Sequence, residues 1–386
     1  MDREKYSSLV EAMADVPDPR GTQGQRYGWR LLMTLIAWAM VAGQRSGHGI
    51  AHWVELHRET LIEQLALPYD RLPSEPTLRR VLRFVDVLKL EERLACLREN
   101  QAIDQTETPP ASESAERVGQ AIDGKALRGA AHHGRPITLV GRVVHGTAEV
   151  LGEVAVADKS NEITAVPELL AGQDLTGTVT TMDALLTQRE LTKQILGQGG
   201  DYLLMAKENQ PRLFTTIALH FDNPPPTRII HWVKTEDKGH GRIEIRILET
   251  MEATDGWVDW PGVRQIMRRT TIRKLLRSGK SSTEITYGLT SLDPSQATPA
   301  QLERLWRGHW TIENKLHYVR DVTLGEDACQ ARCGSTPQAL AALRNAILDL
   351  LRQHGWTRIP DALRYHAARP TEALQLIGAV PSPMPA

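Results

Sequence analysis

Residues 177–206, GTVTTMDALLTQRELTKQILGQGGDYLLMA, decide the fold class of this chain. The run 179–182 and the run 201–206 are typical of β-strands, and a helix is predicted between them over 188–196. Further apolar runs upstream predict strands over 118–122, 137–144 and 150–157. Strands that alternate with helices after an initial set of three strands indicate a mixed α/β core.

The regions on both sides of this core have different patterns. Helical signals dominate the first hundred residues, whereas residues 227–291 alternate apolar and polar side chains as strands do. Residues 102–117, AIDQTETPPASESAER, have the polar, proline-bearing composition of a linker. We therefore predict a helical N-terminal domain over 1–101, a linker over 102–117, the first part of the core over 118–225, a β-rich insertion over 226–295, the last part of the core over 296–355, and a C-terminal helix and tail over 356–386.

Composition places the chain among globular proteins of more than one domain. It has 386 residues, of which 41% are hydrophobic and 24% charged. Lys and Arg number 46 against 47 Asp and Glu, a net charge of -1. This balance argues against a protein that coats nucleic acid by bulk charge, because such binding rests on phosphate neutralisation. Local basic patches remain compatible with it.

The sequence favours a cytoplasmic protein with no membrane partner. Three cysteines, Cys96, Cys329 and Cys333, are too few for a disulfide framework or a four-thiolate zinc site, which suggests a reducing compartment. The first twenty residues lack the pattern of a signal peptide. The apolar run 31–42 is shorter than the roughly 20 residues that a membrane-spanning helix needs.

Two aspartates follow predicted strands. Asp123 ends the run that begins at 118 and precedes Gly124, and Asp183 follows the run 179–182. A carboxylate at a strand end is held in place while remaining accessible, which suits catalysis. The alternative for Asp123 is an Asp-Gly hairpin turn, and for Asp183 a loop or helix N-cap.

A third carboxylate, Glu313, lies in the predicted helix RLWRGHWTIENKLHYVRDV, residues 304–322. Helical spacing places five residues on one face, namely Trp306, Trp310, Glu313, His317 and Arg320. A buried ion pair is the alternative for Glu313. Three carboxylates from separate elements suit two Mg²⁺ or Mn²⁺ ions and the chemistry of a phosphodiester bond.

Several motifs resemble the ISAs1-type (IS4-like) DDE transposases of bacterial insertion sequences, which include the H-repeat-associated proteins. In chain order these are AIDGKALRGA (121–130), DKSNEITAVPELL (158–170), TMDALLTQRELTKQILGQGGDYLLMAKENQP (181–211), GHGRIEIR (239–246) and HWTIENKLHYVRDVTLGEDACQAR (309–332). The resemblance implies an α/β fold: an RNase H-like mixed-sheet catalytic core with a β-rich insertion and an all-α N-terminal domain. It also implies that Asp123, Asp183 and Glu313 form the catalytic, metal-binding triad.

The resemblance further implies an activity and partners. Such an enzyme binds the terminal inverted repeats of its element, cleaves them with two Mg²⁺ or Mn²⁺ ions and transfers the ends into target DNA. A homodimer on double-stranded DNA is expected because two ends must meet. In the wider IS4-like group the Glu lies in a four-residue signature, and Trp306, His309, Glu313 and Arg320 occupy those spacings here. Arg320 keeps a cation where a phosphate-contacting Lys is expected.

Clusters of cations are the candidates for DNA contact. The helix predicted in RLPSEPTLRRVLRFV (71–85) carries Arg79 and Arg80, and is either a DNA-reading helix or a solvated basic face. The run 264–280, RQIMRRTTIRKLLRSGK, has no acidic residue, and phosphate contact is favoured over a solvated face. Its cations are Arg264, Arg268, Arg269, Arg273, Lys274, Arg277 and Lys280. Weaker candidates are Lys125, Arg128, Lys207, His240 and Arg242, with His309 and Arg320 from the signature.

Two other functions stay open at this stage. One is a catalytically inactive, domesticated transposase relative that only binds DNA, against which the complete triad speaks. The other is a generic metal-dependent nuclease, which would cleave DNA that lacks any specific end sequence.

Overall fold

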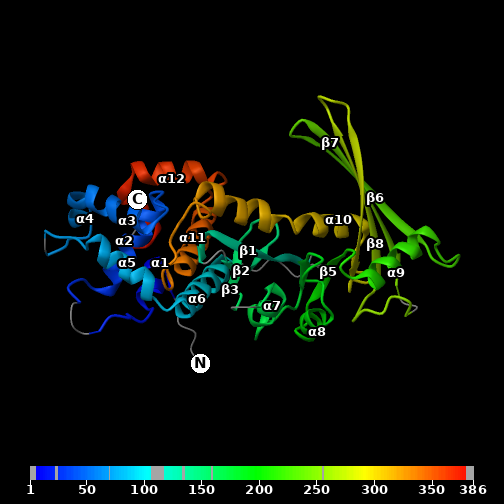
Figure 1. Cartoon of the computed structure of the whole chain (residues 1–386), viewed down its shortest axis with the longest axis horizontal. Helices are drawn as coiled ribbons and strands as arrows, with labels where there is room; N and C mark the ends of the chain where they lie inside the picture. Colours follow the sequence, from blue (N-terminus) through cyan, green and yellow to red (C-terminus); the bar gives the residue numbers. More distant parts are fainter. Residues whose placement is uncertain are drawn as a thin grey trace.

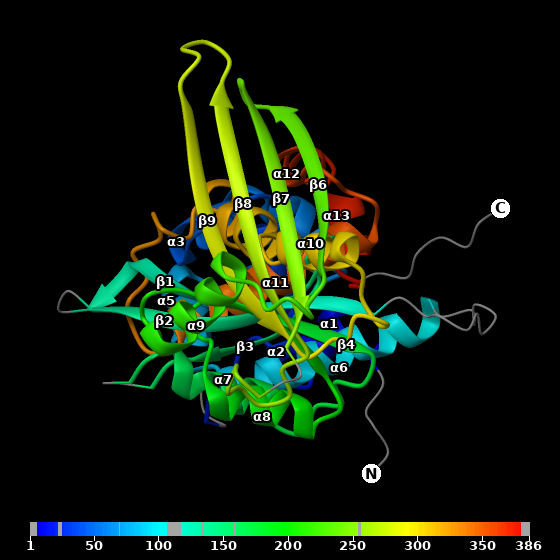
Figure 2. The ribbon, with the colours of Figure 1, turned by 90° about the vertical axis from the view of Figure 1, so that its right-hand side faces the viewer.

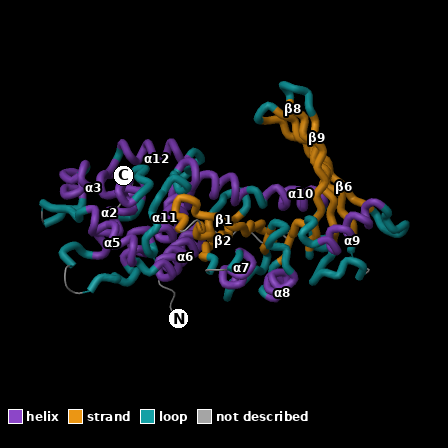
Figure 3. The backbone as a smooth tube through the Cα atoms, in the orientation of Figure 1, coloured by secondary structure: helices purple, strands orange, loops and turns teal. Residues whose placement is uncertain are grey.

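The computed structural model describes residues 6–21, 25–68, 70–105, 117–132, 135–157, 160–253 and 256–379. Helices gather at one end of the molecule and strands at the other (Figure 3). The predicted linker lies largely outside the described residues, since 106–116 are not among them, and its first residues belong to a helix that continues to Gln105. None of the described helices is long and apolar enough to cross a membrane.

The N-terminal region is helical, as predicted. Its helices are α1 (Leu9–Ala14), α2 (Trp29–Val41), α3 (Gly47–Leu56), α4 (Arg58–Gln64), α5 (Glu75–Phe84) and α6 (Val87–Gln105). The apolar run predicted to be too short for a membrane forms α2, which is buried along most of its length. Three C-terminal helices pack beside this bundle and share its hydrophobic core: α11 (Thr336–Gln353), α12 (Ile359–Ala368) and α13 (Pro370–Leu376).

The central sheet begins with five strands in the order β3-β2-β1-β4-β5. These are β1 (Val118–His132), β2 (Arg135–Val144), β3 (Val150–Ala155), β4 (Thr178–Met182) and β5 (Asp201–Ala206). The β1, β4 and β5 strands are parallel, whereas β2 runs antiparallel to both of its neighbours. This is the mixed sheet of an RNase H-like fold, so the predicted fold class is confirmed.

Helices cover this sheet on two sides (Figure 1). On one side lie α7 (Glu162–Leu170) and α8 (Arg189–Gly197), which connect β3 to β4 and β4 to β5. On the other side lies α10 (Pro299–Gly308), which contacts β1, β4 and β5. The active-site candidates of β1 and β4 therefore lie between two helical layers.

The predicted β-rich insertion follows α9 (Pro211–Asp222) and is a ribbon of four antiparallel strands. These are β6 (Ile230–Gly239), β7 (Arg242–Glu252), β8 (Gln265–Leu275) and β9 (Ser281–Thr290). Because β9 pairs with β5, the ribbon extends the central sheet to nine strands rather than forming a separate sheet. Its far end projects well beyond the core (Figure 2).

The helix predicted around Glu313 changes its geometry after α10. Two π-helical segments follow, η1 (Ile312–His317) and η2 (Val319–Thr323). Trp306 is buried in α10 whereas Trp310, in the turn after α10 ends at Gly308, is 44% exposed, so the prediction that both share one face is wrong. A π-helix also has a longer turn than the α-helix assumed in the sequence analysis, which shifts the residues after Ile312 relative to that face.

Candidate active site

Asp123 and Asp183 lie side by side in the sheet. The last residue pair of the parallel strands β1 and β4 is Ile122 with Met182. Asp123 and Asp183 directly follow these two residues in the sequence. Neighbouring strands lie about 5 Å apart, so the two carboxylates meet at one edge of the sheet. Asp123 does not end its strand, however, since β1 continues to His132, and the hairpin-turn alternative is wrong.

Asp183 lies in the turn between β4 and α8. Its Oδ1 accepts hydrogen bonds from the backbone N–H groups of Leu185 and Leu186, both at 3.0 Å. One of the two carboxylate oxygens of Asp183 thus forms hydrogen bonds within the loop, as the loop alternative predicted. The bonds fix the direction of the carboxylate, and no hydrogen bond among the described residues engages its Oδ2.

Electrostatic coupling brings Glu313 into the same cluster. The pKa of Asp123 is raised to about 7, first by burial and then by the charges of Asp183, Glu313 and Glu162, against a hydrogen bond from the Gly124 N–H that lowers it. The pKa of Glu313 is raised by burial and by Asp183, and lowered by Lys207. The three predicted carboxylates therefore lie close enough for their charges to affect one another's pKa.

His317, the last residue of η1, faces Asp123. Its Nδ1 lies 3.7 Å from Asp123 Oδ2. Burial lowers the pKa of His317 to about 3, helped by the positive charges of Arg320 and Lys125. The imidazole is consequently neutral near pH 7, and its contact with Asp123 is not an ion pair that offsets the negative charge.

The carboxylate cluster fits a hard divalent cation chemically. Oxygen ligands of this kind suit Mg²⁺ or Mn²⁺, and the mutual repulsion of the carboxylates is what a cation would relieve. Among the described residues, no three His, Cys, Asp or Glu side chains are already arranged to hold one ion together. Coordination would thus require the carboxylate side chains to rearrange.

One acidic residue of the cluster was missed by the sequence analysis. Glu162, the first residue of α7, is coupled to both Asp123 and Asp183. It lies within the DKSNEITAVPELL motif, but its place at a helix start is also that of an ordinary first-turn acid. Only the fold brings it to the aspartates.

Several residues that were predicted to contact DNA are buried and form ion pairs. Arg320 is fully buried and donates to Glu326 at 2.9 and 3.0 Å, to Asn345 at 3.1 Å, and to Glu153. A side chain without exposure cannot contact a phosphate, so the prediction is wrong for Arg320. Its network instead joins η2 to β3 and α11.

Lys125, the second residue after Asp123, belongs to the same buried system. Its Nζ pairs with Asp321 and lies 3.8 Å from Glu326 Oε2, and the side chain is 6% exposed. The prediction of a DNA contact is wrong for Lys125 as well. Its position next to the cluster ties β1 to η2, the segment that follows the one bearing Glu313.

Arg269 and His309 are buried too. Arg269 donates to Glu303 at 2.8 Å and lies over the Trp306 ring. The His309 Nδ1 lies 3.2 Å from Thr181 Oγ1, and burial lowers the pKa of His309 to about 4. Both side chains hold α10 against the sheet, so the predicted DNA contacts are wrong for these two residues.

The remaining cations of the ribbon divide into paired and unpaired groups. Arg268 pairs with Glu249 at 2.7 Å, Arg273 with Glu284 at 2.7 Å, and Arg242 with Glu244 at 2.7 Å. At the far end of the ribbon, three exposed cations have no ion pair with any described residue, namely Lys274, Arg277 and Lys280. Alternation along β8 thus splits the basic run between two faces, and Lys274, Arg277 and Lys280 at the ribbon end are accessible to phosphates.

Of the other predicted contacts, Lys207 and Arg128 adjoin the strands of the carboxylates, whereas His240 lies at the far end of the ribbon. Lys207 directly follows β5, is exposed, and is coupled to Glu313. Arg128 on β1 has an 80% exposed side chain, 3.9 Å from Asp327. His240 occupies the tight turn between β6 and β7, with a φ of 48°.

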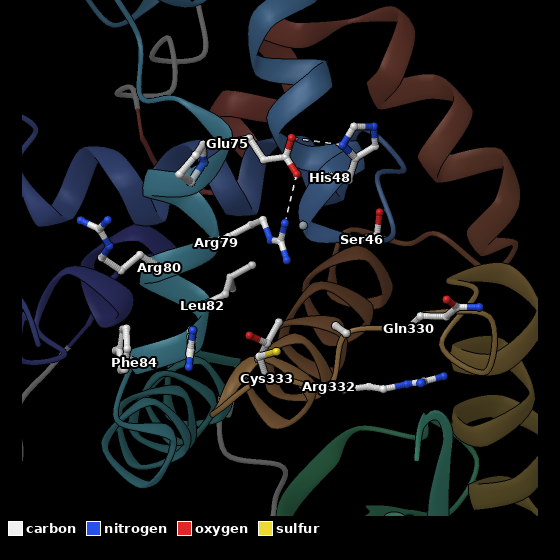
Figure 4. Close-up of a pocket in the computed structure, with 15 residues that line it drawn as sticks. Ser46, His48, Glu75, Arg79, Arg80, Leu82, Phe84, Gln330, Arg332 and Cys333 are labelled. Atoms are coloured by element: carbon white, nitrogen blue, oxygen red, sulfur yellow. Dashed lines mark hydrogen bonds and ion pairs between the residues drawn. The ribbon is translucent and has the colours of Figure 1, made fainter. Parts of the chain in front are cut away.

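A basic pocket lies between α3, α5 and the segment 330–336 (Figure 4). Arg79 and Arg80 line it together with Arg83, Arg332 and the exposed ring of Phe84. Arg79 is 3.6 Å from Glu75 and keeps 65% of its side chain exposed. The arginines predicted on this helix are therefore accessible and face a hollow of the surface.

This arrangement defines a class of protein: an RNase H-like chain with two aspartates just beyond the last residue pair of β1 and β4. The chain belongs to the family described as "Transposase DDE domain", whose profile matches residues 101–350. Residues 10–98 match a second family, described as "DDE_Tnp_1-associated". The predicted family resemblance is confirmed.

Relatives with similar sequences come from Escherichia coli K12. "Putative protein YbfL" is 29% identical over 361 residues, covering 90% of this chain and 91% of the relative. "H repeat-associated putative transposase YhhI" is 28% identical over 362 residues, again covering 90% and 91%. A cryo-EM structure of a piggyBac transposase synaptic complex with hairpin DNA is similar with a TM-score of 0.44 and 11% identity, covering 97% of this chain and 78% of that one.

Proposed function

We propose that this protein binds the terminal inverted repeats of an insertion sequence and catalyses divalent-metal-dependent DNA cleavage and strand transfer into target DNA. The observation that carries the proposal is the adjacency of Asp123 and Asp183 beyond the last β1–β4 pair, with Glu313 coupled to both. Membership of the transposase family supports the same reaction.

The triad would hold the metal ions. Bound at Asp123, Asp183 and Glu313, two Mg²⁺ or Mn²⁺ ions would supply nucleophile activation and stabilisation of the leaving oxygen. Lys207, exposed beside Glu313, is placed to orient the scissile phosphate. The buried network of Arg320 and Lys125 holds the segment that bears Glu313 against β1 and thereby positions the third carboxylate.

Two surfaces would bind DNA on either side of this site. The α5 pocket offers Arg79 and Arg80 to the transposon end, and the end of the ribbon offers Lys274 and Arg277 to phosphates farther along. Because strand transfer joins two ends, we propose a homodimer on DNA. The reaction would take place on DNA in the bacterial cytoplasm.

The test uses DNA that carries the inverted repeats flanking the coding region, compared with the same duplex after the repeats are scrambled. Asp123→Asn, Asp183→Asn and Glu313→Gln should reduce Mg²⁺-dependent cleavage to background and leave end binding intact. Glu168→Gln, at an exposed position of α7, is the matched control and should cleave as the wild type does. Cleavage by all three triad variants would refute the site.

The same assay separates the other functions. Equal cleavage of repeat and scrambled duplexes would indicate a generic nuclease. Binding of the repeats with no cleavage by the wild type would indicate an inactive, domesticated relative.

A further inference from the structure

We propose that His145 is a positioning residue for DNA cleavage, which holds the segment that bears Glu313 at a fixed place against β1 and β4. The inference rests on the proposed function, because it concerns how the same three carboxylates are placed. His145 lies outside all of the motifs that carry the family resemblance.

The imidazole of His145 lies between two glycines of different elements. His145 follows β2 in the turn that leads to β3. A Cβ atom on Gly119 of β1 would lie 2.2 Å from its Nδ1, and a Cβ atom on Gly308, the last residue of α10, would lie 2.1 Å from the same atom. Both distances are far below a van der Waals contact, so only glycines leave room for the ring. The imidazole therefore sets the spacing between β1 and α10.

A hydrogen-bond network extends this contact to β4. The Nε2 atom of His145 lies 2.9 Å from Thr181 Oγ1, and Nδ1 of His309 lies 3.2 Å from the same oxygen. The Thr181 hydroxyl donates to the Gln120 carbonyl oxygen at 3.0 Å. Since a hydroxyl donates one hydrogen and accepts two, both imidazoles donate to it and its capacity is filled. The network joins the turn, β1, β4 and the end of α10 at one point.

The same turn also holds both flanks of Glu313. The Gly146 N–H donates to Thr311 Oγ1 at 3.2 Å, and the Gly146 carbonyl oxygen accepts from Lys315 Nζ. These two partners lie two residues before and two residues after Glu313. Gly146 has a φ of 77°, a conformation that glycine adopts without strain. The backbone next to His145 is thus attached directly to the Glu313 segment.

The partners of His145 distinguish it from a histidine that only fills the core. The elements that it joins are those that carry Asp123, lead to Asp183 and carry Glu313. Burial and the charge of His309 lower the pKa of His145 to about 4, so the imidazole is neutral near pH 7 and acts through hydrogen bonds and packing. A displacement of about 1 Å at a reacting group can cost about a hundredfold in rate. Loss of the His145 contacts should therefore slow the chemical step.

Hydrogen–deuterium exchange of the full-length protein tests the hold without relying on activity. His145→Leu fills the space between the glycines but lacks the N–H donor, and its backbone should exchange faster than the wild type over residues 311–317. His145→Gln keeps a side-chain N–H and should retain most of the protection. The matched control is His220→Leu, which changes a buried histidine of α9, a helix that packs on β8 and β9. It should leave exchange over 311–317 unchanged.

Gly119→Ala reaches the same ring from β1. The added Cβ must push the imidazole away from Thr181, so exchange over 311–317 should rise as it does in His145→Leu. Gly197→Ala, where a Cβ meets nothing within 4 Å, is the matched control and should exchange as the wild type does.

Single-turnover cleavage of the inverted-repeat duplex at saturating protein measures the effect on the reaction. His145→Leu should bind the duplex as the wild type does and cleave it about a hundredfold more slowly. His145→Gln should recover much of the rate, and His220→Leu should cleave at the wild-type rate. A merely structural role would instead lower binding and cleavage together, because unfolded protein does neither.

The outcomes separate this inference from the proposed function. Wild-type exchange over 311–317 in His145→Leu, or a loss of protection there that His220→Leu shares, would overturn the positioning role. Cleavage by His145→Leu at the wild-type rate would overturn it as well and leave the proposed function in place. Absence of cleavage by the wild type would overturn the proposed function, and the exchange result would then decide alone whether His145 holds the segment.

Discussion

Replacing Asp123 with Asn should stabilise the metal-free protein, and the gain should depend on pH. The pKa of Asp123 is raised from 3.8 to about 7 in the folded chain by burial and by neighbouring carboxylates. Between these values the folded protein binds a proton that the unfolded chain has lost. The contribution of Asp123 to stability is therefore fully present below about pH 4 and is lost as the pH rises towards 7.

The magnitude follows from the same pKa. Each pKa unit corresponds to about 1.4 kcal/mol, so a rise from 3.8 to about 7 sets a ceiling of about 4 kcal/mol on the penalty at pH 8. The Asp123 side chain is 20% exposed, and solvent screening reduces this to about 2 kcal/mol. For a unit of this size, about 2 kcal/mol corresponds to roughly 4 °C in melting temperature.

The assay is thermal unfolding of wild type and Asp123→Asn in EDTA at pH 5 and pH 8. About a third of the penalty is already present at pH 5, so the difference between the two proteins should be larger at pH 8 than at pH 5 by roughly 2–3 °C. Comparing the two pH values cancels the intrinsic effect of the substitution. Added Mg²⁺ should raise the wild-type melting temperature at pH 8 by mass action and leave the variant unchanged. An equal difference at both pH values would refute the cluster of repelling carboxylates.

Three further variants test the supports of the site and the DNA path. Gly308→Ala places a Cβ 2.1 Å from Nδ1 of His145, and the overpacking should cost about 1–3 kcal/mol in a thermal melt. Arg320→Met removes the cation paired with buried Glu153 and leaves Glu326 with Arg344, and it should lower stability by about 3–5 kcal/mol. The double substitution of Lys274 and Arg277 by Ala should lower the slope of log affinity for DNA against log salt by about 2 with no change in melting temperature.

Each of these variants has a matched control. Gly197→Ala, at the end of α8, meets nothing within 4 Å and should melt as the wild type does. Arg128→Met removes an exposed cation and should cost little stability. Lys193→Ala, on α8, should leave DNA affinity unchanged. A ribbon variant that binds DNA as the wild type does would contradict the proposed path.

The strands and their carboxylates could be predicted from the sequence because their signals are local. Apolar runs that end in Asp123 and Asp183 indicate both the sheet and the edge where the aspartates meet. The extent of β1 could not be predicted, because Gly124 and Lys125 interrupt the apolar run while the strand continues. The residues that contact them lie far away in the sequence: Glu162 packs against Gly124, and Asp321 pairs with Lys125.

The predicted cation contacts failed for the same physical reason. Arg320 pairs with Glu153, 167 residues away, and Lys125 pairs with Asp321, 196 residues away. Sequence reasoning counts charges along the chain and cannot show which ones a fold will bury together. A cation within a basic run can therefore serve the core, as Arg269 does with Glu303.

The near-neutral net charge acquires a different meaning once these pairs are known. The buried arginines and lysine compensate the buried acids, whereas the carboxylates around Asp123 have no such partners among the described residues. A DNA phosphate approaching this cluster would meet the negative charge of its carboxylates, which Lys207, coupled to Glu313, offsets only in part. Productive binding of the scissile phosphate should therefore require the divalent cations themselves. Binding of DNA away from the site, at α5 and the ribbon end, should persist in EDTA.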